Sequence, residues 1–440
     1  MASIHSGIVT SSRAAPANGF DSLAEWLAWQ ERLHFTAIEL GLDRCREVAR
    51  RMGLLQPDFT VVSIAGTNGK GSSATMLDLI MNRAGYRTGR YTSPHLLRYN
   101  ERVCLRGTEV SDEELCLAFE RIDQARGDVS LTYFEFGTLA ALDIFRKAGI
   151  DLAILEVGLG GRLDAVNMID ADVALVTTVD MDHERWLGFD RESIGREKSG
   201  IYRAGRPAIC ADPEPPASVA QTAHSVGASH YQLHRDFTYV TGEQTWEWKS
   251  GETVFAELPK PSINHGRQVQ NAAGVLMVLK QLAPCFPVPR DTVSAGLREF
   301  RLPGRFQIIP GRVPCIFDVA HNRQAAEVLA MNLAALPCSG DTHLVIGMLK
   351  DKNHHAVLSA LADSVDTWQV ASLSGERGAA AALLAGVLAG IRHRGAVNVF
   401  ENVPDALRAA SARAIPGDRI VITGSFVTVG AALSSLDIGV

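Results

Sequence analysis

A glycine-rich loop between two apolar segments constrains this chain more than any other feature. The loop is Gly66-Thr67-Asn68-Gly69-Lys70-Gly71-Ser72, and the uncharged run Thr60–Ala65 before it predicts a buried β-strand. Residues 72 to about 83 predict a helix. Glycines let backbone N–H groups turn toward an anion, and a helix N-terminus adds partial positive charge. This order predicts a cradle for a nucleotide triphosphate, with Lys70 reaching the terminal phosphates.

The loop departs from the usual phosphate-binding pattern G-x-x-x-x-G-K-[ST]. Only two residues separate Gly66 from Gly69, and Gly71 stands where a serine or threonine would coordinate magnesium. Ser72 comes one position late, so we expect another oxygen ligand to help hold the metal. The alternative is a strand-to-helix turn that needs glycine and happens to carry a lysine. Three glycines, the lysine and both flanking elements favour the phosphate cradle.

Composition indicates a globular protein and limits its partners. A length of 440 residues favours two or three domains, and 46% apolar with 21% charged residues is typical of soluble domains. The net charge of −6 gives no reason to expect nucleic acid or an anionic membrane. The seven cysteines are scattered, with no C-x-x-C pair, which favours a reducing cytoplasm over disulfides or zinc. The longest apolar runs fall short of a membrane span or are interrupted.

Apolar strands that alternate with helices predict an α/β fold. We expect a mainly parallel sheet covered on both faces, followed by a smaller Rossmann-like α/β domain. An antiparallel excursion interrupts the first pattern at 237–258. The predicted domains are a flexible extension over 1–20, a P-loop ATP-binding domain over 21–302 and a C-terminal domain over 303–440. The predicted strands after the first are 152–156, 173–179, 207–211, 315–319, 343–346, 367–371, 397–400 and 419–423. The other predicted helical stretches are 21–53, 134–148, 270–282, 325–336 and 379–391.

Two polar residues follow strands of the predicted parallel sheet. Glu156 ends an apolar strand and opens the glycine-rich segment 157–164, where ligands bind in such sheets. We favour a magnesium ligand over a solvated loop acid, because the glycines allow a close backbone approach. His183 follows the strand 173–179, so Glu156, Asp182 and His183 converge on one metal region. A histidine satisfied by ordinary polar contacts is an equally open alternative.

Other candidates are weaker when taken from the residues alone. Ser93, in Thr92-Ser93-Pro94-His95, is a candidate for the missing hydroxyl, although a capped turn is the preferred interpretation. Lys198 lies on a short helical stretch, and surface charge is its neutral interpretation. In the C-terminal half, Arg305 and the segment 318–322 place polar groups just past a linker and a strand, where they face the first domain across a cleft.

Eight motifs in one order resemble a known family. They are G-T-N-G-K-G-S, T-S-P-H-L, L-T-Y-F-E, L-E-V-G-L-G-G-R-L-D-A-V-N, D-H-x-x-W-L-G, R-E-K-S-G-I, L-P-G-R-F and D-V-A-H-N. Together they resemble the folylpolyglutamate synthase/dihydrofolate synthase family of the Mur ligase superfamily, and most of all its bacterial bifunctional members. The resemblance runs from about residue 40 to 429. It implies a P-loop ATPase domain and a Rossmann-like domain with the active site between them.

The resemblance also implies roles for individual residues. The loop 66–72, Asn271, Arg305 and Asp318 would bind ATP. Ser93, Glu156 and His183 would ligate Mg²⁺, and Lys198 matches a lysine that is carbamylated in the family. His321 and Ser425 lie where the family binds glutamate, and Thr132, Phe134 and Asp164 lie near its pterin site. The expected catalytic residues are Lys70, His183, Lys198, Asp318 and His321. A second Mg²⁺ and a monovalent cation are further candidates.

The implied reaction is ATP-dependent amide formation. A substrate carboxylate attacks the γ-phosphate to give an acyl phosphate, and the amine of L-glutamate displaces phosphate. The expected substrates are dihydropteroate and reduced folates, and we expect a monomer. Two departures from the family pattern put local detail in doubt: Arg323 replaces a frequent proline, and Asn353 replaces a usual acid.

Two other functions are alternatives to this one. A Mur-type ligase for a cell-wall nucleotide precursor would need a further N-terminal domain, and only 65 residues precede the loop. A P-loop switch that lacks ligase chemistry would be expected to carry the base-binding motif N-K-x-D, which the sequence lacks.

Overall fold

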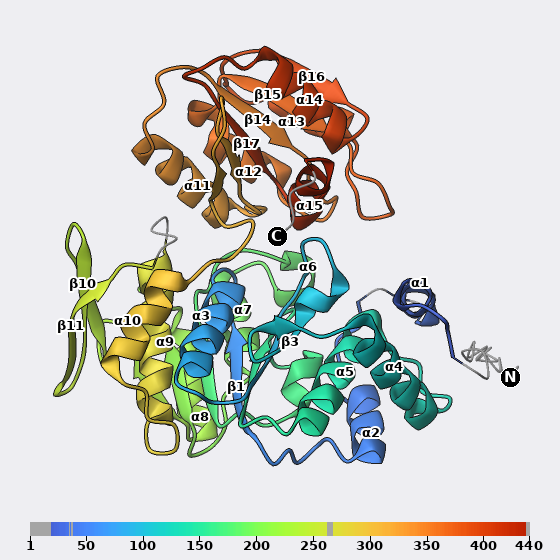
Figure 1. The fold of residues 1–440 in the computed structure, drawn as a ribbon, viewed down its shortest axis with the longest axis vertical. Helices are drawn as coiled ribbons and strands as arrows, with labels where there is room; N and C mark the ends of the chain where they lie inside the picture. The colour runs from blue at the N-terminus through green and yellow to red at the C-terminus, as the bar shows by residue number, and fades with distance from the viewer. Residues whose placement is uncertain (1–18, 35, 37, 262–266, 437–440) are drawn as a thin grey trace, which may run out of the picture.

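Two separate α/β sheets organise the chain in the computed structural model, which describes residues 19–34, 36, 38–261 and 267–436. The N-terminal unit holds an eight-stranded sheet and the C-terminal unit a six-stranded sheet (Figure 1). The predicted fold class, a mainly parallel α/β domain followed by a smaller α/β domain, is therefore confirmed. No helix in the described ranges combines the length and apolarity needed to cross a bilayer.

The first sheet is parallel over most of its width. Its strand order is β4-β3-β2-β5-β1-β6-β7-β8, and only the β2–β3 and β3–β4 pairs are antiparallel. Its strands are β1 Thr60–Ala65, β2 Thr88–Tyr91, β3 Val103–Leu105, β4 Thr108–Glu109, β5 Leu152–Glu156, β6 Val173–Val176, β7 Pro207–Cys210 and β8 Ser229–Gln232. The centre of the sheet is β5-β1-β6, so the loops that leave these three strands lie together at its carboxyl edge.

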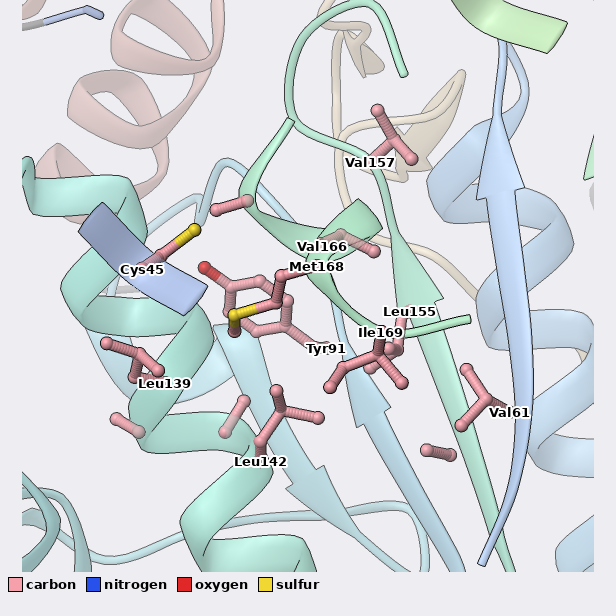
Figure 2. Close-up of a cluster of buried hydrophobic side chains, with 14 of the residues drawn as sticks. Cys45, Val61, Tyr91, Leu139, Leu142, Leu155, Val157, Val166, Met168 and Ile169 are labelled. Atoms are coloured by element: carbon pink, nitrogen blue, oxygen red, sulfur yellow. The ribbon is translucent and has the colours of Figure 1, made fainter. Parts of the chain in front are cut away.

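Alternation along the strands builds a core on each face of this sheet. Val61 of β1 belongs to the layer beneath α5, whereas Val62 and Ile64 pack against α3 and α9. Figure 2 shows part of the first layer, in which Val61, Leu155 and Leu139 converge with neighbours from several elements. The helices are α1 Leu23–Leu33, α2 Asp43–Met52, α3 Lys70–Arg83, α4 Asp112–Arg126, α5 Tyr133–Ala148, α6 Glu184–Leu187, α7 Arg191–Ser199, α8 Ala217–Val226, α9 Gln268–Leu282 and α10 Arg290–Glu299, with 3₁₀ turns η1 Tyr99–Arg102 and η2 Ala165–Met168.

The predicted antiparallel excursion is a separate three-stranded sheet at the edge of this unit (Figure 1). Its order is β11-β10-β9, with strands β9 Thr238–Thr241, β10 Thr245–Ser250 and β11 Thr253–Pro259. Trp246 and Trp248 of β10 point to one side and are buried against α9, which fixes the small sheet to the main core.

The C-terminal unit repeats the layered plan with a six-stranded sheet ordered β12-β13-β17-β14-β15-β16. The strands are β12 Gln307–Ile309, β13 Cys315–Phe317, β14 Thr342–Ile346, β15 Thr367–Ala371, β16 Val397–Phe400 and β17 Arg419–Thr423. The helices are α11 Arg323–Ala335, α12 His354–Leu361, α13 Ala381–Leu388, α14 Val403–Arg413 and α15 Phe426–Ser435, with the 3₁₀ turn η3 Ala362–Ser364. Leu344 faces α11 and α12, whereas Val345 faces α14 and α15.

The structure differs from the sequence predictions mainly at the N-terminus. The helical stretch expected over 21–53 is two helices, α1, which ends at Leu33, and α2, which begins at Asp43. Residues 1–18 of the predicted extension lie outside the described residues, but Phe20 packs its ring against Trp26 at 5.0 Å. Strands β3, β4, β8 and β12 were not predicted, and none of them is longer than four residues. The boundary at 302/303 stays a prediction.

Candidate active site

Backbone hydrogen bonds hold the glycine-rich loop against the end of β6. The Thr67 N–H donates to the Thr178 carbonyl at 2.7 Å, and the Asn68 N–H donates to the Thr178 hydroxyl at 3.1 Å. Gly66 has a φ of +148°, and a Cβ there would lie 1.9 Å from the Thr177 Oγ1. The loop therefore requires glycine for both its conformation and its close approach to β6.

Gly69 and Lys70 complete the loop where α3 begins. Gly69 has a φ of +88°, and a Cβ there would meet the Asn271 Oδ1 of α9 at 2.4 Å. Asn271 therefore lies directly beside the loop, as the predicted contact of Asn271 with ATP requires. The Lys70 Nζ donates to the carbonyls of Gly66 at 3.0 Å and Thr67 at 3.2 Å, so the lysine folds back over the loop. Ser72 is buried within α3, and the side chain of Gln268 reaches its hydroxyl at 3.4 Å.

Ser93 and Glu156 are brought together directly beneath this loop. The Ser93 N–H donates to the Glu156 Oε2 at 3.1 Å, and Glu156 is 4% exposed. A Cβ on Gly71 would lie 3.4 Å from the same Oε2, so the carboxylate is in van der Waals reach of the start of α3. Burial raises the pKa of Glu156, while the charges of Lys70 and Arg305 oppose that shift. A buried carboxylate beside two cationic side chains is a suitable environment for an anionic ligand, such as a phosphate, that carries a bound metal cation.

His183 lies at the same edge of the sheet, in the left-handed backbone region at a φ of +52°. Burial lowers its pKa to about 4, which outweighs the charge of Asp182, so the imidazole is neutral near pH 7. Its Nε2 is 3.3 Å from the Nζ of Lys352 in the C-terminal unit. A serine, a glutamate and a neutral histidine are suitable ligands for a divalent cation. No three His, Cys, Asp or Glu side chains cluster as a metal site within the described ranges, so this set stays a prediction.

Lys198 is a buried lysine near the end of α7. It is 4% exposed, and burial lowers its pKa to about 7, with the positive charge of Lys70 adding to the shift. A Cβ on Gly161 would lie 2.7 Å from the backbone carbonyl oxygen of Lys198. The loop after β5 therefore packs closely on α7. A surface-charge role is wrong for this lysine. A large fraction of its amine is neutral near pH 7 and is therefore nucleophilic.

Arg305 and Asp318 are two half-buried residues of opposite charge at the start of the C-terminal unit. Burial raises the pKa of Asp318 and lowers that of Arg305, and each charge opposes the shift of the other. The Asp318 carboxylate accepts from the N–H groups of Phe306 and Ala320, both at 2.9 Å. The Arg305 guanidinium lies 4.9 Å from the centre of the Phe426 ring, a cation–π contact that fixes its direction.

His321 and Ser425 follow neighbouring strands β13 and β17 of the second sheet. The His321 Nδ1 bonds the Val319 carbonyl at 2.8 Å, which leaves the Nε2 directed toward Asp182 at 3.6 Å. Ser425 is the N-cap of α15, where its hydroxyl accepts from the Thr428 N–H at 3.0 Å. The His321 imidazole thus reaches the first unit, while the Ser425 hydroxyl is engaged within its own helix.

The three residues expected near the pterin lie around the start of α5 and the loop after β5. Thr132 caps α5, because its hydroxyl accepts from the Glu135 N–H at 3.2 Å. A Cβ on Gly158 would lie 2.6 Å from the Phe134 ring, so the ring packs directly against the backbone of the loop after β5. Burial raises the pKa of Asp164 to about 7, and its carboxylate accepts from the N–H groups of Leu159 and Val166. The structure places Phe134 against this loop and shows Asp164 holding it together.

The sequence predicted that the segment 318–322 faces the first domain, as Asn322 does, but it did not predict that Gln324 and Lys352 also join the two units. Asn322 and Gln324 of the C-terminal unit hydrogen-bond Asn68 of the glycine-rich loop, and Lys352 bonds Asp182. The motif D-V-A-H-N already contained Asn322, so its position after a strand was the available signal. Lys352 lies in a loop that was noted only for the family departure at Asn353, and nothing in that loop indicates a partner in the first unit.

The fold and the site define the class of the protein as a ligase of the Mur type. A family model described as "Mur ligase, glutamate ligase domain" matches residues 304–426, which is most of the C-terminal unit. The chain is 44% identical over 415 residues to the dihydrofolate synthase/folylpolyglutamate synthase of Escherichia coli K12, and the match covers 94% of this chain and 96% of the relative. The chain belongs to the dihydrofolate synthase/folylpolyglutamate synthase family.

Solved structures of relatives share the whole architecture. The structure of E. coli FolC in complex with DHPP and ADP superposes with a TM-score of 0.89 at 44% identity, covering 94% of this chain and 98% of that one. A bifunctional folylpolyglutamate synthase/dihydrofolate synthase with Mn, AMPPNP and L-glutamate bound gives a TM-score of 0.87 at 43% identity, with coverage of 95% and 98%. The two-unit arrangement described above is therefore that of known enzymes.

Proposed function

We propose that this chain is an ATP-dependent ligase that adds L-glutamate to dihydropteroate and to reduced folates. The observation that carries the proposal is the meeting of the two units: the glycine-rich loop bonds directly to Asn322, the neighbour of His321. A phosphate cradle and a predicted amino-acid site are thus adjacent. The relatives support the same function, because one binds AMPPNP, Mn and L-glutamate and another binds DHPP and ADP.

The cradle positions the nucleotide. Backbone N–H groups of the loop 66–72 and the N-terminus of α3 would face the phosphates, and Lys70 would move from its carbonyl contacts to them. Asn271 and Arg305 complete the proposed ATP site from α9 and from the C-terminal unit. A divalent cation held by Ser93, Glu156 and His183 would neutralise phosphate charge.

The chemistry needs a leaving group, because a carboxylate is a poor electrophile. The substrate carboxylate oxygen attacks the γ-phosphorus, the bond to the β–γ bridging oxygen breaks, and ADP leaves an acyl phosphate behind. The amine of glutamate then attacks the acyl carbon, loses a proton and displaces inorganic phosphate. Lys70 and Arg305 stabilise charge on the transferring group, and the two units hold the reactants in place. His321 and Ser425 are the proposed glutamate contacts, with Asp318 holding Arg305.

Carbamylation of Lys198 is part of this proposal. A buried amine with a pKa of about 7 is substantially neutral under ordinary conditions and can attack CO₂, which gives a carbamate and a proton. The carbamate would place a carboxylate-like group near Lys70 and could hold a second Mg²⁺; a monovalent cation is proposed with it. The test is the ¹³C NMR spectrum of enzyme in ¹³C-bicarbonate. A carbamate signal that is absent from Lys198→Ala supports the proposal, and identical spectra from the two proteins would reject it.

The folate side of the site is proposed to lie around α5 and the loop after β5. Phe134 would contact the flat pterin ring, with Thr132 and Asp164 nearby. We further propose that the protein acts as a cytoplasmic monomer without nucleic acid or membrane partners. All seven cysteines are free thiols, which agrees with a reducing compartment.

One assay separates this function from its alternatives. ADP release is measured with L-glutamate plus either dihydropteroate or tetrahydrofolate, and the products are weighed by mass spectrometry. We expect activity with both substrates and a product that is heavier by one glutamyl residue. Activity with tetrahydrofolate alone would remove the synthase half of the proposal. ADP release that needs no amine acceptor would favour a nucleotide switch instead.

A further inference from the structure

Asp182 lies where the two units meet and is contacted by three side chains of the C-terminal unit. The Lys352 Nζ donates to its Oδ1 at 2.7 Å, and the Asn322 Nδ2 donates to its Oδ2 at 3.2 Å. The His321 Nε2 lies 3.6 Å from the same Oδ2. The side chains of Asp182 and Lys352 are 9% and 6% exposed, so this ion pair is shielded from solvent. A single carboxylate of the first unit therefore meets two loops of the second.

We propose that Asp182 is a positioning residue that holds His321 over the phosphate cradle, with Lys352 as its charge partner. Both carboxylate oxygens are already engaged by the second unit, which favours this role over metal ligation.

Asn322 extends the same contact to the glycine-rich loop. The Asn68 Nδ2 donates to the Asn322 Oδ1 at 3.3 Å, and the Asn322 Nδ2 donates back to the Asn68 Oδ1 at 3.1 Å. The Gln324 Oε1 accepts from the same Asn68 amide at 2.7 Å. Because Asn322 also caps α11 through the Ala325 N–H, its side chain is fixed in direction. Asp182 and Asn68 thus hold one loop of the second unit from two sides.

The geometry also links Asp182 to its neighbour His183. The His183 N–H donates to the Asp182 Oδ1 at 2.8 Å, and the backbone of His183 is in the left-handed region. The titratable groups around Asp182 are Lys352 and His321 from the second unit and His183, Lys70 and Lys198 from the first. Loss of the carboxylate would leave the buried ammonium of Lys352 without its partner, and the two loops of the second unit would move away from it.

The test uses three variants: Asp182→Asn, Lys352→Met and the double variant that combines these two changes. Each is compared with a control variant, Lys350→Met. Lys350 is an exposed neighbour whose ammonium donates to the Glu376 carbonyl at 2.8 Å, so its variant is the matched control. The activity arm rests on the proposed function. We expect KM for glutamate to rise about tenfold or more in each of the first two variants, with KM for ATP changed less than about threefold. The double variant should be no worse than the worse single variant, because both remove one pair.

Two readouts separate positioning from a merely structural role. Lys352→Arg, which keeps the charge, should recover most of the glutamate KM. Small-angle X-ray scattering of nucleotide-free protein should give a larger radius of gyration for Asp182→Asn and Lys352→Met than for Lys350→Met. If Asp182→Asn does not fold, Lys352→Met tests the same link from the other unit.

The inference is overturned if the glutamate KM and the radius of gyration of both variants match those of Lys350→Met. It is also overturned if the effects of the two single variants multiply in the double variant. A wild-type enzyme without ligase activity would reject the proposed function instead, and the scattering comparison would still decide whether Asp182 holds the units together.

Discussion

The glycine-rich loop and the loop that faces it are held in different ways. Thr67 and Asn68 are fixed by bonds to Thr177, Thr178 and Asp180 of their own unit, several of them from the backbone. Across the interface, the contacts to the loop 321–324 come from side chains. The phosphate cradle is therefore built by one unit alone, whereas the proposed glutamate site depends on how two units meet.

This difference has a consequence for binding. A backbone cradle keeps its shape whether or not the second unit is in place, so nucleotide binding should tolerate changes at the interface. Side-chain contacts between Asn68, Asn322, Asp182 and Lys352 can be removed one at a time, and each should act mainly on the second half of the reaction.

The largest effect is expected from the lysine of the cradle. Lys70→Ala removes the charge that faces the terminal phosphates, so ADP release should fall by about 10³-fold or more. The measurement is substrate-dependent ADP release at saturating ATP. Arg83→Ala, at the far end of the same helix, is the control and should keep wild-type turnover. Substantial turnover in Lys70→Ala would contradict the proposed phosphate contact.

The next effect concerns the pH dependence of stability. The pKa of Lys198 is about 7 in the folded protein and about 10.5 in the unfolded chain. Between these values the unfolded state binds more protons, so the unfolding free energy should rise with pH by up to about 1.4 kcal/mol per pH unit. Below about pH 7 the amine is protonated in both the folded and the unfolded state, so Lys198 no longer makes the unfolding free energy depend on pH. Urea unfolding of wild type and Lys198→Met in CO₂-free buffer should show the rise in wild type alone, and parallel curves would contradict the lysine's burial.

A smaller effect tests whether the cradle really requires glycine. Gly69→Ala combines a positive φ with a contact of 2.4 Å to the Asn271 Oδ1. We expect a loss of about 2–4 kcal/mol in unfolding free energy. Gly227 has a similar φ of +72° but open space around it, so Gly227→Ala should lose only about 1–2 kcal/mol. Adding Asn271→Ala to Gly69→Ala should recover part of the lost unfolding free energy. Equal losses in Gly69→Ala and Gly227→Ala would show that the contact with Asn271 has no effect on stability.

The smallest effect is expected at a position where the family pattern differs. Arg323 is the first residue of α11, where proline is well accommodated, and its exposed side chain pairs with Glu327 at 2.7 Å. Arg323→Pro should change the unfolding free energy by no more than about 0.5 kcal/mol and leave turnover unchanged. Thermal unfolding checks the first and ADP release the second. A large loss of unfolding free energy or of turnover would show that the loop 321–324 depends on more than side-chain contacts.

The sequence predicted the parts of the fold that local patterns determine. Strands such as 152–156 and 419–423 have the predicted bounds, because buried parallel strands are short apolar runs with clear ends. The break between α1 and α2 was not predicted within the helical stretch 21–53. Glu156 and Ser93 were candidates because they follow strands, and the structure brings them together at 3.1 Å.

The contacts between the units could not be predicted in the same way. Lys352 and Asp182 are 170 residues apart, and neither lies in a periodic segment that would reveal its partner. Asp182 was expected only as a member of the metal region, whereas its oxygens face the second unit. Such pairs depend on the packing of two domains, which local spacing does not encode.

The most direct test of the central claim is an isotope-transfer experiment. Dihydropteroate with ¹⁸O in its carboxylate is incubated with ATP, L-glutamate and the enzyme, and the released phosphate is analysed by mass spectrometry. The account predicts one ¹⁸O atom in each inorganic phosphate, because the carboxylate oxygen that attacks the γ-phosphorus leaves with it. Unlabelled phosphate, formed while the glutamate adduct accumulates, would contradict activation through an acyl phosphate.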